Sequence, residues 1–213
     1  MPEPFAFCQR HFSPGAAALL LAVLASLPGA AAEFTTGGYS FSDELGGFRL
    51  LSATGSGKAD DPIVIAEEIF EVAPVTLVIR NRNLAVGGFE SVRAQLTVVK
   101  RVANASERVW AGFEMELQEV RKQPSVYSDG LSFKQFAVMA PDVSSDSFIE
   151  NERRFEPYDR VEFSNGHVDP GTTAEFKITI TDPTPVREFY LVQDPKLLAA
   201  ELPVPGPSFA ALD

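Results

Sequence analysis

The sequence predicts an all-β fold, a single antiparallel β-sandwich that follows a cleaved N-terminal segment. Two observations carry this prediction. Phenylalanine, valine, isoleucine and threonine recur in short runs of alternating apolar and polar residues, and Gly, Pro, Asn and Asp separate the runs. This pattern is typical of strands and turns, and it lacks the regular alternation of strands with helices that marks an α/β protein. We expect the immunoglobulin-like variety, with a jelly roll or a small barrel as alternatives.

Residues 1–32 predict a cleavable secretory signal peptide. Arg10 precedes an apolar run at residues 16–27, and three small residues at 30–32 form a cleavage site before Glu33. The apolar run has about a dozen residues, whereas a membrane-spanning helix needs about 20. We therefore expect an exported protein, periplasmic or extracellular, without stable membrane insertion.

Removal of residues 1–32 also removes Cys8, the single cysteine, so disulfides and thiol chemistry are excluded from the processed chain. The net charge stays at −11, because the removed segment contains one Arg and one Glu. This charge opposes binding to nucleic acid or to an anionic membrane surface, since both need clustered Lys and Arg. A single histidine remains, His167, which excludes a multi-histidine zinc or iron site.

Six short runs predict strands along the chain. They are residues 48–53, 63–68, 75–80, 160–163, 172–181 and 187–193. The clearest is 172–181, where Phe176, Ile178 and Ile180 alternate with polar residues. A period of two places one set of side chains on a core and the other in water.

Residues 107–120 fit both a strand and a helix. As a strand, Phe113 lies on the core face and Trp110 on the polar face, whereas a helix would bury a longer apolar stripe. Gly112 in the interior of a helix costs about 1 kcal/mol relative to alanine, so we favour the strand. Because residues 91–102 are also rich in strand-forming residues, and Asn104-Ala105-Ser106 supplies a turn, the two segments predict one long antiparallel hairpin.

The processed chain is long enough for one domain, which we expect at residues 33–196. Residues 121–159 contain Pro, Gly and a serine-rich stretch, which predicts a long connection of the kind that often carries function. Residues 197–213 contain three prolines and predict a flexible tail.

The chain offers no catalytic constellation, because the Gly-x-Ser-x-Gly motif is absent and the lone histidine lies among turn residues. Calcium is the one metal left open as an alternative. Oxygen donors outside the predicted strands are Asp60, Asp61, Asp142, Asp146 and Glu150, although they lack the order of an EF-hand loop. We otherwise expect no cofactor.

Trp110, Tyr127 and Asp129 are the candidate ligand-binding residues. An aromatic ring on a flat sheet face can stack on a sugar or anchor a protein contact, and Trp110 falls on the predicted polar face. Tyr127 and Asp129 follow it in the predicted connection and would add hydrogen bonds. The alternative is that the connection covers Trp110.

Several stretches of the processed chain resemble exported proteins of Gram-negative bacteria that have no assigned function. These stretches are residues 40–51, Gly55-Ser56-Gly57, residues 60–65, residues 180–185 and Phe189-Tyr190-Leu191-Val192-Gln193. The resemblance implies a periplasmic or extracellular bacterial setting. It implies no catalytic residues.

These observations lead to the hypothesis of an exported, non-catalytic module that binds a protein or glycan partner or takes a structural part in the cell envelope. One alternative is a secreted polysaccharide hydrolase that uses a pair of carboxylates. Another is a periplasmic assembly factor that pairs an edge strand with a client protein.

Overall fold

The computed structural model describes residues 31–84, 94–125, 127–133, 143–154 and 157–197. The chain divides into two compact units, Met1–Ala30 and Ala31–Asp213, and every described residue belongs to the second. Most of the predicted signal peptide and the predicted tail after Leu197 therefore lie outside the described residues.

The second unit contains two β-sheets. In spatial order, the seven-stranded sheet is β1 (Glu33–Thr36), β2 (Tyr39–Ser42), β5 (Val75–Asn81), β13 (Glu188–Leu197), β7 (Trp110–Gln118), β11 (Asp159–Gly166) and β10 (Phe148–Arg154). The other sheet is β3 (Phe48–Thr54), β4 (Ile63–Ile69), β6 (Ala94–Asn104), β12 (Thr173–Asp182) and β8 (Ser132–Phe133), with β9 (Ser144–Ser145) also paired to β12. We call this second sheet the six-stranded sheet. One 3₁₀ turn, η1 (Tyr127–Asp129), precedes β8.

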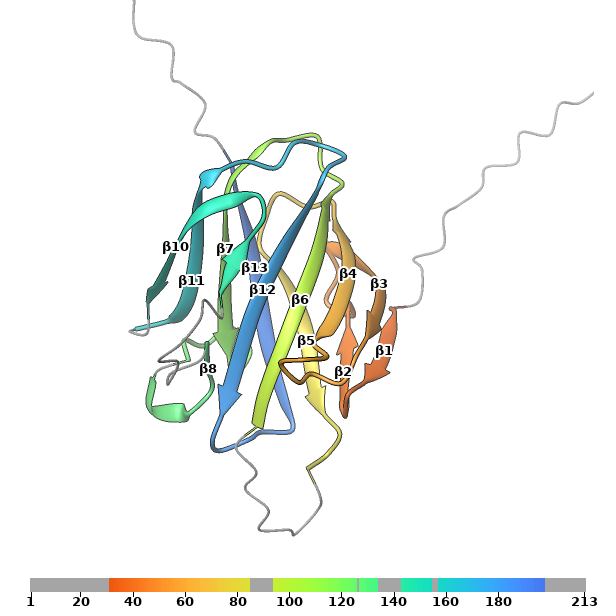
Figure 1. The fold of residues 1–213 in the computed structure, drawn as a ribbon, viewed down its shortest axis with the longest axis vertical. Helices are drawn as coiled ribbons and strands as arrows, with labels where there is room; N and C mark the ends of the chain where they lie inside the picture. Colours follow the sequence, from red (N-terminus) through yellow and green to blue (C-terminus); the bar gives the residue numbers. More distant parts are fainter. Residues whose placement is uncertain (1–30, 85–93, 126, 134–142, 155–156, 198–213) are drawn as a thin grey trace, which may run out of the picture. The chain divides into compact units, whose positions relative to one another are not determined.

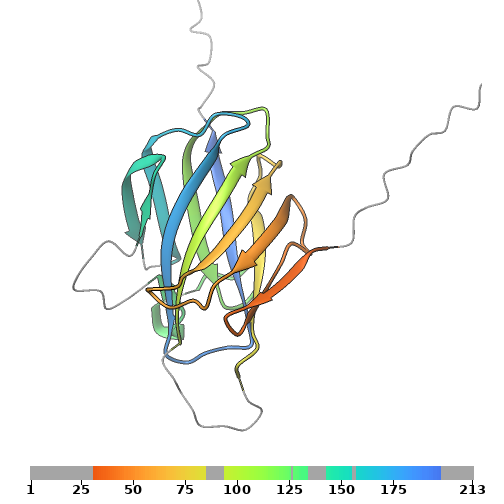
Figure 2. The same ribbon diagram turned by 45° about the vertical axis from the view of Figure 1, so that its right-hand side comes forward.

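The two sheets form two layers with the hydrophobic core between them. Figure 1 shows β6 and β12 in front of β5 and β13, and Figure 2 shows the same layers after a turn of 45°. Along most strands, buried residues alternate with partly exposed ones, as a sheet with one core face requires. The all-β, sandwich-like prediction is confirmed, and the described residues contain no α-helix.

Phe176 of β12 connects the two layers. Its ring centroid lies 4.7 Å from that of Phe113 in β7, 4.9 Å from that of Phe163 in β11 and 6.0 Å from that of Phe148 in β10. All four rings are buried. Aromatic pairs at such separations contribute about 0.5–1.5 kcal/mol beyond the burial of their area. One side chain of the six-stranded sheet thus packs against three strands of the opposite sheet.

The prediction of a purely antiparallel sandwich is wrong for one pair of strands. β4 and β6 are parallel, with Ile63 opposite Val98, while every other strand pair of the two sheets is antiparallel. The reason is the path of the chain. β5, which separates them in sequence, belongs to the opposite sheet, so the chain returns beside β4 in the same direction.

The predicted hairpin of residues 91–102 and 107–120 is also wrong, because β6 and β7 lie in different sheets. Asn104, at the end of β6, is fully buried, and its Nδ2 donates to the carbonyls of Arg108 (2.8 Å) and Val168 (3.0 Å). Its Oδ1 accepts from the hydroxyl of Ser106 at 2.7 Å. These bonds stabilise a connector that crosses from one sheet to the other. A tight turn would instead have returned the chain to the same sheet.

The six runs predicted as strands coincide with β3, β4, β5, β11, β12 and β13, and residues 107–120 contain the strand β7 rather than a helix. The span 121–159 contains η1, β8, β9 and β10. Because β10 is an edge strand whose residues are mostly exposed, its sequence shows no alternation of apolar and polar residues.

Candidate functional site

An open pocket of about 290 Å³ lies on the outer face of the seven-stranded sheet. Strands β5, β13 and β7 form its floor, the loop between β2 and β3 forms one wall, and the turn after β7 forms the other. Its lining residues are Leu45, Gly46, Pro74, Val75, Thr76, Gln118, Arg121, Lys122 and Val192. Sites for small molecules begin at about 300 Å³, so the volume of this pocket lies just under the small end of that class.

The pairing of the strands places the floor residues side by side. Val192 of β13 is opposite Thr76 of β5, and Gln118 of β7 is opposite Tyr190, the next outward-facing residue of β13. The intervening Leu191 is buried in the core. Since successive side chains of a strand point to opposite faces, the floor consists of the outward-facing residues of three neighbouring strands.

The wall between β2 and β3 is held by Asp43. Its carbonyl accepts from the N–H of Gly46 at 2.9 Å, and its carboxylate Oδ2 accepts from the N–H of Leu50 at 2.9 Å. Gly47 has a φ of 85°, and a Cβ there would lie 2.6 Å from Cγ1 of Val75. Only glycine fits this close approach, so the sequence Ser-Asp-Glu-Leu-Gly-Gly specifies the shape of this wall.

The wall after β7 is a tight turn. The N–H of Gln123 donates to the carbonyl of Val120 at 3.0 Å, and the N–H of Lys122 donates to Oε1 of Gln118 at 2.8 Å. Lys122 has a φ of 63°, a left-handed conformation that costs a non-glycine residue about 1–2 kcal/mol. The turn places the exposed side chains of Arg121 and Lys122 at the mouth of the pocket.

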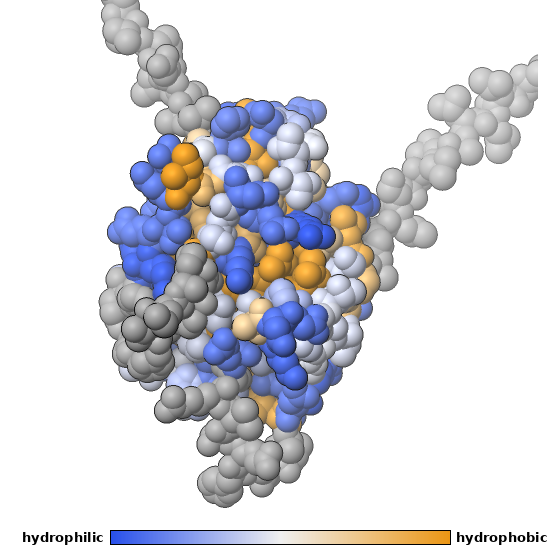
Figure 3. Space-filling view, in the orientation of Figure 1, coloured by the Kyte–Doolittle hydropathy of each residue, from blue (hydrophilic) through white to orange (hydrophobic). Residues whose placement is uncertain are grey.

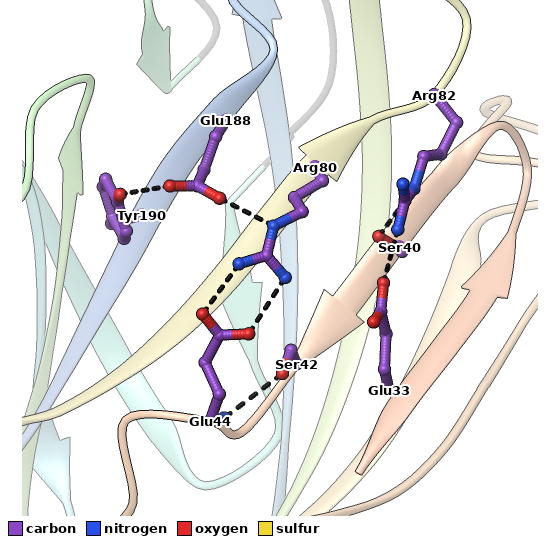
Figure 4. Close-up of polar contacts among 8 residues, drawn as sticks. All are labelled: Glu33, Ser40, Ser42, Glu44, Arg80, Arg82, Glu188 and Tyr190. Atoms are coloured by element: carbon purple, nitrogen blue, oxygen red, sulfur yellow. Dashed lines mark hydrogen bonds and ion pairs between the residues drawn. The ribbon is translucent and has the colours of Figure 1, made fainter. Parts of the chain in front are cut away.

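A polar network borders the pocket (Figure 4). Arg80 of β5 forms a bidentate pair with Glu44 (3.0 and 2.7 Å) and donates from Nε to Glu188 of β13 at 2.6 Å. The hydroxyl of Tyr190 donates to the same Glu188 carboxylate. The hydrogen bonds from Arg80 are the main reason that the pKa of Glu44 is lowered. Glu44 directly precedes Leu45 in the wall between β2 and β3. The ion pair of Glu44 with Arg80 therefore holds this wall against strand β5.

The network continues to the edge of the sheet. Arg82 donates to the hydroxyl of Ser40 at 3.0 Å and to Glu33 of β1 at 2.6 Å, as Figure 4 shows. The hydrogen bond to Ser40 is the largest cause of a lowered pKa at Glu33, and the bond from Arg82 follows it. The two arginines cover β2, which explains why Ser40 is buried although it faces outward.

Three glutamates beside the pocket, Glu44, Glu188 and Glu116, have basic partners. Glu116 accepts from Nε of Arg160 at 2.7 Å, and its other oxygen accepts from Nε2 of Gln118 at 2.7 Å. By contrast, Arg121 and Lys122 form no ion pair with any described carboxylate. None of the nine lining residues is acidic. The pocket lining therefore carries two positive charges that have no ion-pair partner among the described residues, in a chain whose net charge is −11.

The outer face of the six-stranded sheet is different. Figure 3 views this face and shows apolar residues gathered over β4 and β6. Val64 and Val99 are opposite each other there, both half-buried, and Leu51 nearby is 43% exposed. The surface ion pair of Arg101 with Glu175 lies beside them. This face is apolar at its centre, whereas the opposite face is polar and contains the pocket.

A second cluster of titratable groups lies at the start of β11. Asp159 is 1% exposed, and its carboxylate oxygens form no hydrogen bond of good geometry in the described residues, although Ser132 and the backbone of Phe133 lie close to them. Burial raises the pKa of Asp159 to about 6, the nearby Ser132 and Phe133 offset part of this effect, and the charge of Asp129 adds to it. Burial also raises the pKa of Asp182, again with a contribution from Asp129.

Trp110 does not lie on the outer face, so the predicted side for this residue is wrong. Its side chain is fully buried, with its ring 5.6 Å from that of Phe113. The reason is a β-bulge: Lys196 of β13 pairs with Gly112, whereas Leu197 pairs with Trp110, so one extra residue lies in β7. A bulge reverses the side to which the following residues point. A fully buried ring cannot stack on a ligand at the surface.

The other two candidate residues are parts of the 121–159 span. Tyr127 begins η1, and its side chain lies outside the described residues. Asp129 accepts from the hydroxyl of Ser125 and from the N–H of Leu131 at 3.0 Å. The three candidate residues are not brought together in one site: Trp110 lies in the core, and Asp129 caps a turn.

The aspartates considered for calcium have local roles. Asp61 accepts from the N–H of Ser56 at 3.0 Å, and Asp146 accepts from the N–H of Glu175 at 2.8 Å, while Asp142 lies outside the described residues. Within the described ranges, no three His, Cys, Asp or Glu side chains are grouped to hold a metal ion.

No family model matches this chain, and the comparisons found no similar curated protein and no similar solved structure. Across the residues that the structure describes, no helix has the length and apolar character to span a membrane. The fold and the site thus define a two-sheet β module with a small, positively charged surface pocket.

Sequence reasoning missed the pocket residues. Arg121 and Lys122 are adjacent in the sequence and look like an ordinary charged pair, and Val192 looks like any strand valine. Two separate features of the sequence together point to them. Two basic residues directly follow a strand, and a loop with two glycines from a distant part of the chain lies against them. That meeting depends on the order of strands in the sheet.

Proposed function

We propose that this protein is an exported, non-catalytic binding module, with the outer face of the seven-stranded sheet as its ligand surface. The observation that carries the proposal is the pocket between the loop of Leu45 and the turn of Arg121. Hydrogen bonds and ion pairs fix both walls, as a preformed binding site requires. The lining contains no carboxylate, histidine, serine or cysteine, which favours binding over acid-base or nucleophilic catalysis.

A ligand screen on two matched variants tests this proposal. Val192 and Val99 are half-buried, outward-facing valines on opposite sheets, so Val192→Trp fills the pocket and Val99→Trp serves as its control. A diverse set of small molecules is screened against the purified chain by saturation-transfer NMR. We expect hits that Val192→Trp removes and Val99→Trp leaves in place. Hits that neither variant affects, or the absence of hits, would contradict the proposal.

Export is the second part of the proposal, with the periplasm or the extracellular space as the destination. The residue pattern of 1–32 supports it. Ala32 itself contacts the β-module, because its N–H donates to Oδ1 of Asp43 at 2.7 Å. Intact-mass analysis of the chain released by an exporting host distinguishes a start at Ala32 from the predicted start at Glu33. Recovery of only the full-length chain from the cytosol would contradict export.

The immunoglobulin-like variety of the sandwich belongs to the same proposal. Connections that cross between two facing sheets, such as the one from β6 to β7, support it. An experimental structure with the same strand order, compared with immunoglobulin-like domains, is the test. A strand order that matches a jelly roll would contradict it.

A carboxylate-based polysaccharide hydrolase is the second candidate function. It is favoured by Asp159, a buried carboxylic acid whose pKa is raised to about 6 next to other acidic groups. A raised pKa is typical of a general acid. Release of reducing sugars from a panel of polysaccharides, lost in Asp159→Asn and retained in Val192→Trp, would establish this function in place of binding.

The edge strand β10 favours the third function, an assembly factor. Ile149 on this strand is 81% exposed, and among the strands that the structure describes β10 pairs with a neighbour on one side only. An exposed edge can add a strand from a client protein. A stoichiometric partner recovered by the wild-type chain and lost with Ile149→Lys would support this role, and equal recovery by both would oppose it.

A further inference from the structure

We infer that the pocket binds a small organic anion, a carboxylate carried by an apolar body. This inference rests on the proposed binding function and assigns the chemical class of the ligand. The juxtaposition that carries it is a pair of cations, Arg121 and Lys122, that have no ion-pair partner among the described residues and lie beside the aliphatic side chains of the same pocket.

The charges select an anion. Other basic side chains on this face already form ion pairs. Arg80 pairs with two carboxylates, and Arg160 pairs with Glu116. Arg121 and Lys122 have no such partner in the described part of the chain. Arginine binds a carboxylate through two parallel N–H donors, and lysine supplies a point charge. An incoming carboxylate therefore finds donors that need not first release another anion.

The aliphatic part of the lining favours an apolar body. Leu45, Pro74 and Val192 present aliphatic surface, and about 25 cal/mol is gained for each Å² of apolar surface that a ligand removes from water there. The volume of about 290 Å³ limits the ligand to a small molecule. An inorganic anion would satisfy the two cations but leave this apolar surface in contact with water.

The floor disfavours a polyhydroxylated sugar acid. Gln118 already uses its Nε2 for Glu116 and its Oε1 for the N–H of Lys122. Thr76 supplies the one side-chain hydroxyl of the lining, and it has no partner among the described residues. Several buried ligand hydroxyls would therefore lack partners, at a cost of about 1–3 kcal/mol each.

The test compares four probes by isothermal titration calorimetry: 3-phenylpropionate, its alcohol 3-phenylpropan-1-ol, glucuronate and inorganic phosphate. We expect 3-phenylpropionate to bind at least tenfold more tightly than each of the others. The double variant R121Q/K122Q should abolish this preference. The control R108Q/K58Q removes two exposed cations that lie outside the pocket and have no ion-pair partner in the described part of the chain. It changes the net charge equally, so it should keep the preference.

The outcomes separate the two proposals. If the alcohol binds as tightly as the acid and Val192→Trp removes both, the pocket binds ligands but the anion inference is wrong. If phosphate matches 3-phenylpropionate, the apolar walls contribute nothing and the inference is again wrong. If the control variant loses the preference as fully as R121Q/K122Q, the attraction belongs to the whole chain. If no probe or library member responds to Val192→Trp, the binding function itself fails.

Discussion

The interior of the sandwich and the outer face of its seven-stranded sheet both contain ion pairs, but their surroundings differ. Lys100 of β6 and Glu67 of β4 face the core, are 0% exposed, and pair at 2.8 Å. On the outer face, Arg80 is 25% exposed and shares its charge between Glu44 and Glu188. The interior pair is fully buried, whereas the outer group is partly exposed and belongs to a larger polar network.

The difference shows what each arrangement can contribute. Burial lowers the pKa of Lys100 even though the Glu67 carboxylate favours its charged form, and Oε1 of Glu67 has no hydrogen-bond partner. Such a pair adds little net stability, but the loss of one partner is costly. The outer network is weaker per pair and remains close to water, so it can position a binding site without a large desolvation cost.

The largest effect is expected when one residue of the buried Lys100–Glu67 pair is replaced. We expect Lys100→Met to lower the free energy of unfolding by about 3–5 kcal/mol, because it leaves the Glu67 carboxylate buried and unpaired. Urea unfolding measures this change. In the double variant K100M/E67M, stability should return to the wild-type value or exceed it by about 1–4 kcal/mol. Equal losses in the single and double variants would contradict the comparison.

The second prediction concerns another buried titratable group, Asp159. The folded state holds its proton up to about pH 6, whereas the carboxyl of the unfolded chain has its usual pKa of 3.8. Stability should therefore fall as the pH rises between these values, by up to about 3 kcal/mol. Asp159→Asn should remove this dependence and stabilise the protein by about 1–3 kcal/mol at pH 7.5.

Unfolding free energies of the wild type and Asp159→Asn at pH 4, 5, 6 and 7.5 provide the measurement. The two curves should lie close together at pH 4 and separate above it. Parallel curves over this range would show that Asp159 is ionised at its ordinary pKa in the folded protein.

The third prediction sharpens the contrast on the outer face. Arg80→Met should lower stability by about 1 kcal/mol, because its partners are partly exposed and remain hydrated. The loss should shrink in 1 M NaCl, which screens exposed charges. Since Arg80 positions the wall that contains Leu45, ligand affinity should also fall by about two- to threefold, or roughly 0.5 kcal/mol. A loss as large as that of Lys100→Met would erase the distinction between the two regions.

The smallest effect is expected on the six-stranded sheet. Arg101 and Glu175 are 58% and 44% exposed and pair at 3.0 Å. Arg101→Met should change stability by about 0.5 kcal/mol or less and leave ligand binding unchanged. Weakened ligand binding in Arg101→Met would show that the six-stranded sheet also takes part.

The sequence was sufficient for the elements that alternate cleanly. Residues 172–181 differ from β12 by one residue at each end, because every second residue there faces the core. It was insufficient wherever the result depends on partners distant in the chain. The connector from β6 to β7 depends on the hydrogen bond from Nδ2 of Asn104 to the carbonyl of Val168. No pattern in the nearby sequence reveals this bond.

The candidate site illustrates the same limit. Trp110 was placed on the wrong face because strict alternation assumes an unbroken register, and a single bulge against β13 reverses it. The pocket needs a loop after β2, a turn after β7 and a strand near the end of the chain to meet on one sheet. The lining consists of residue types that are common on any protein surface. Their place in one pocket follows only from the order of the strands.

The most direct test of the central claim, that the outer face of the seven-stranded sheet holds the ligand, is an amide map of the complex. In ¹H–¹⁵N spectra titrated with 3-phenylpropionate, the signals of Thr76, Gln118 and Val192 should shift and saturate with one affinity. The signals of Val64 and Val99 on the opposite sheet should stay in place. Shifts that cluster on Val64 and Val99 instead would contradict the account.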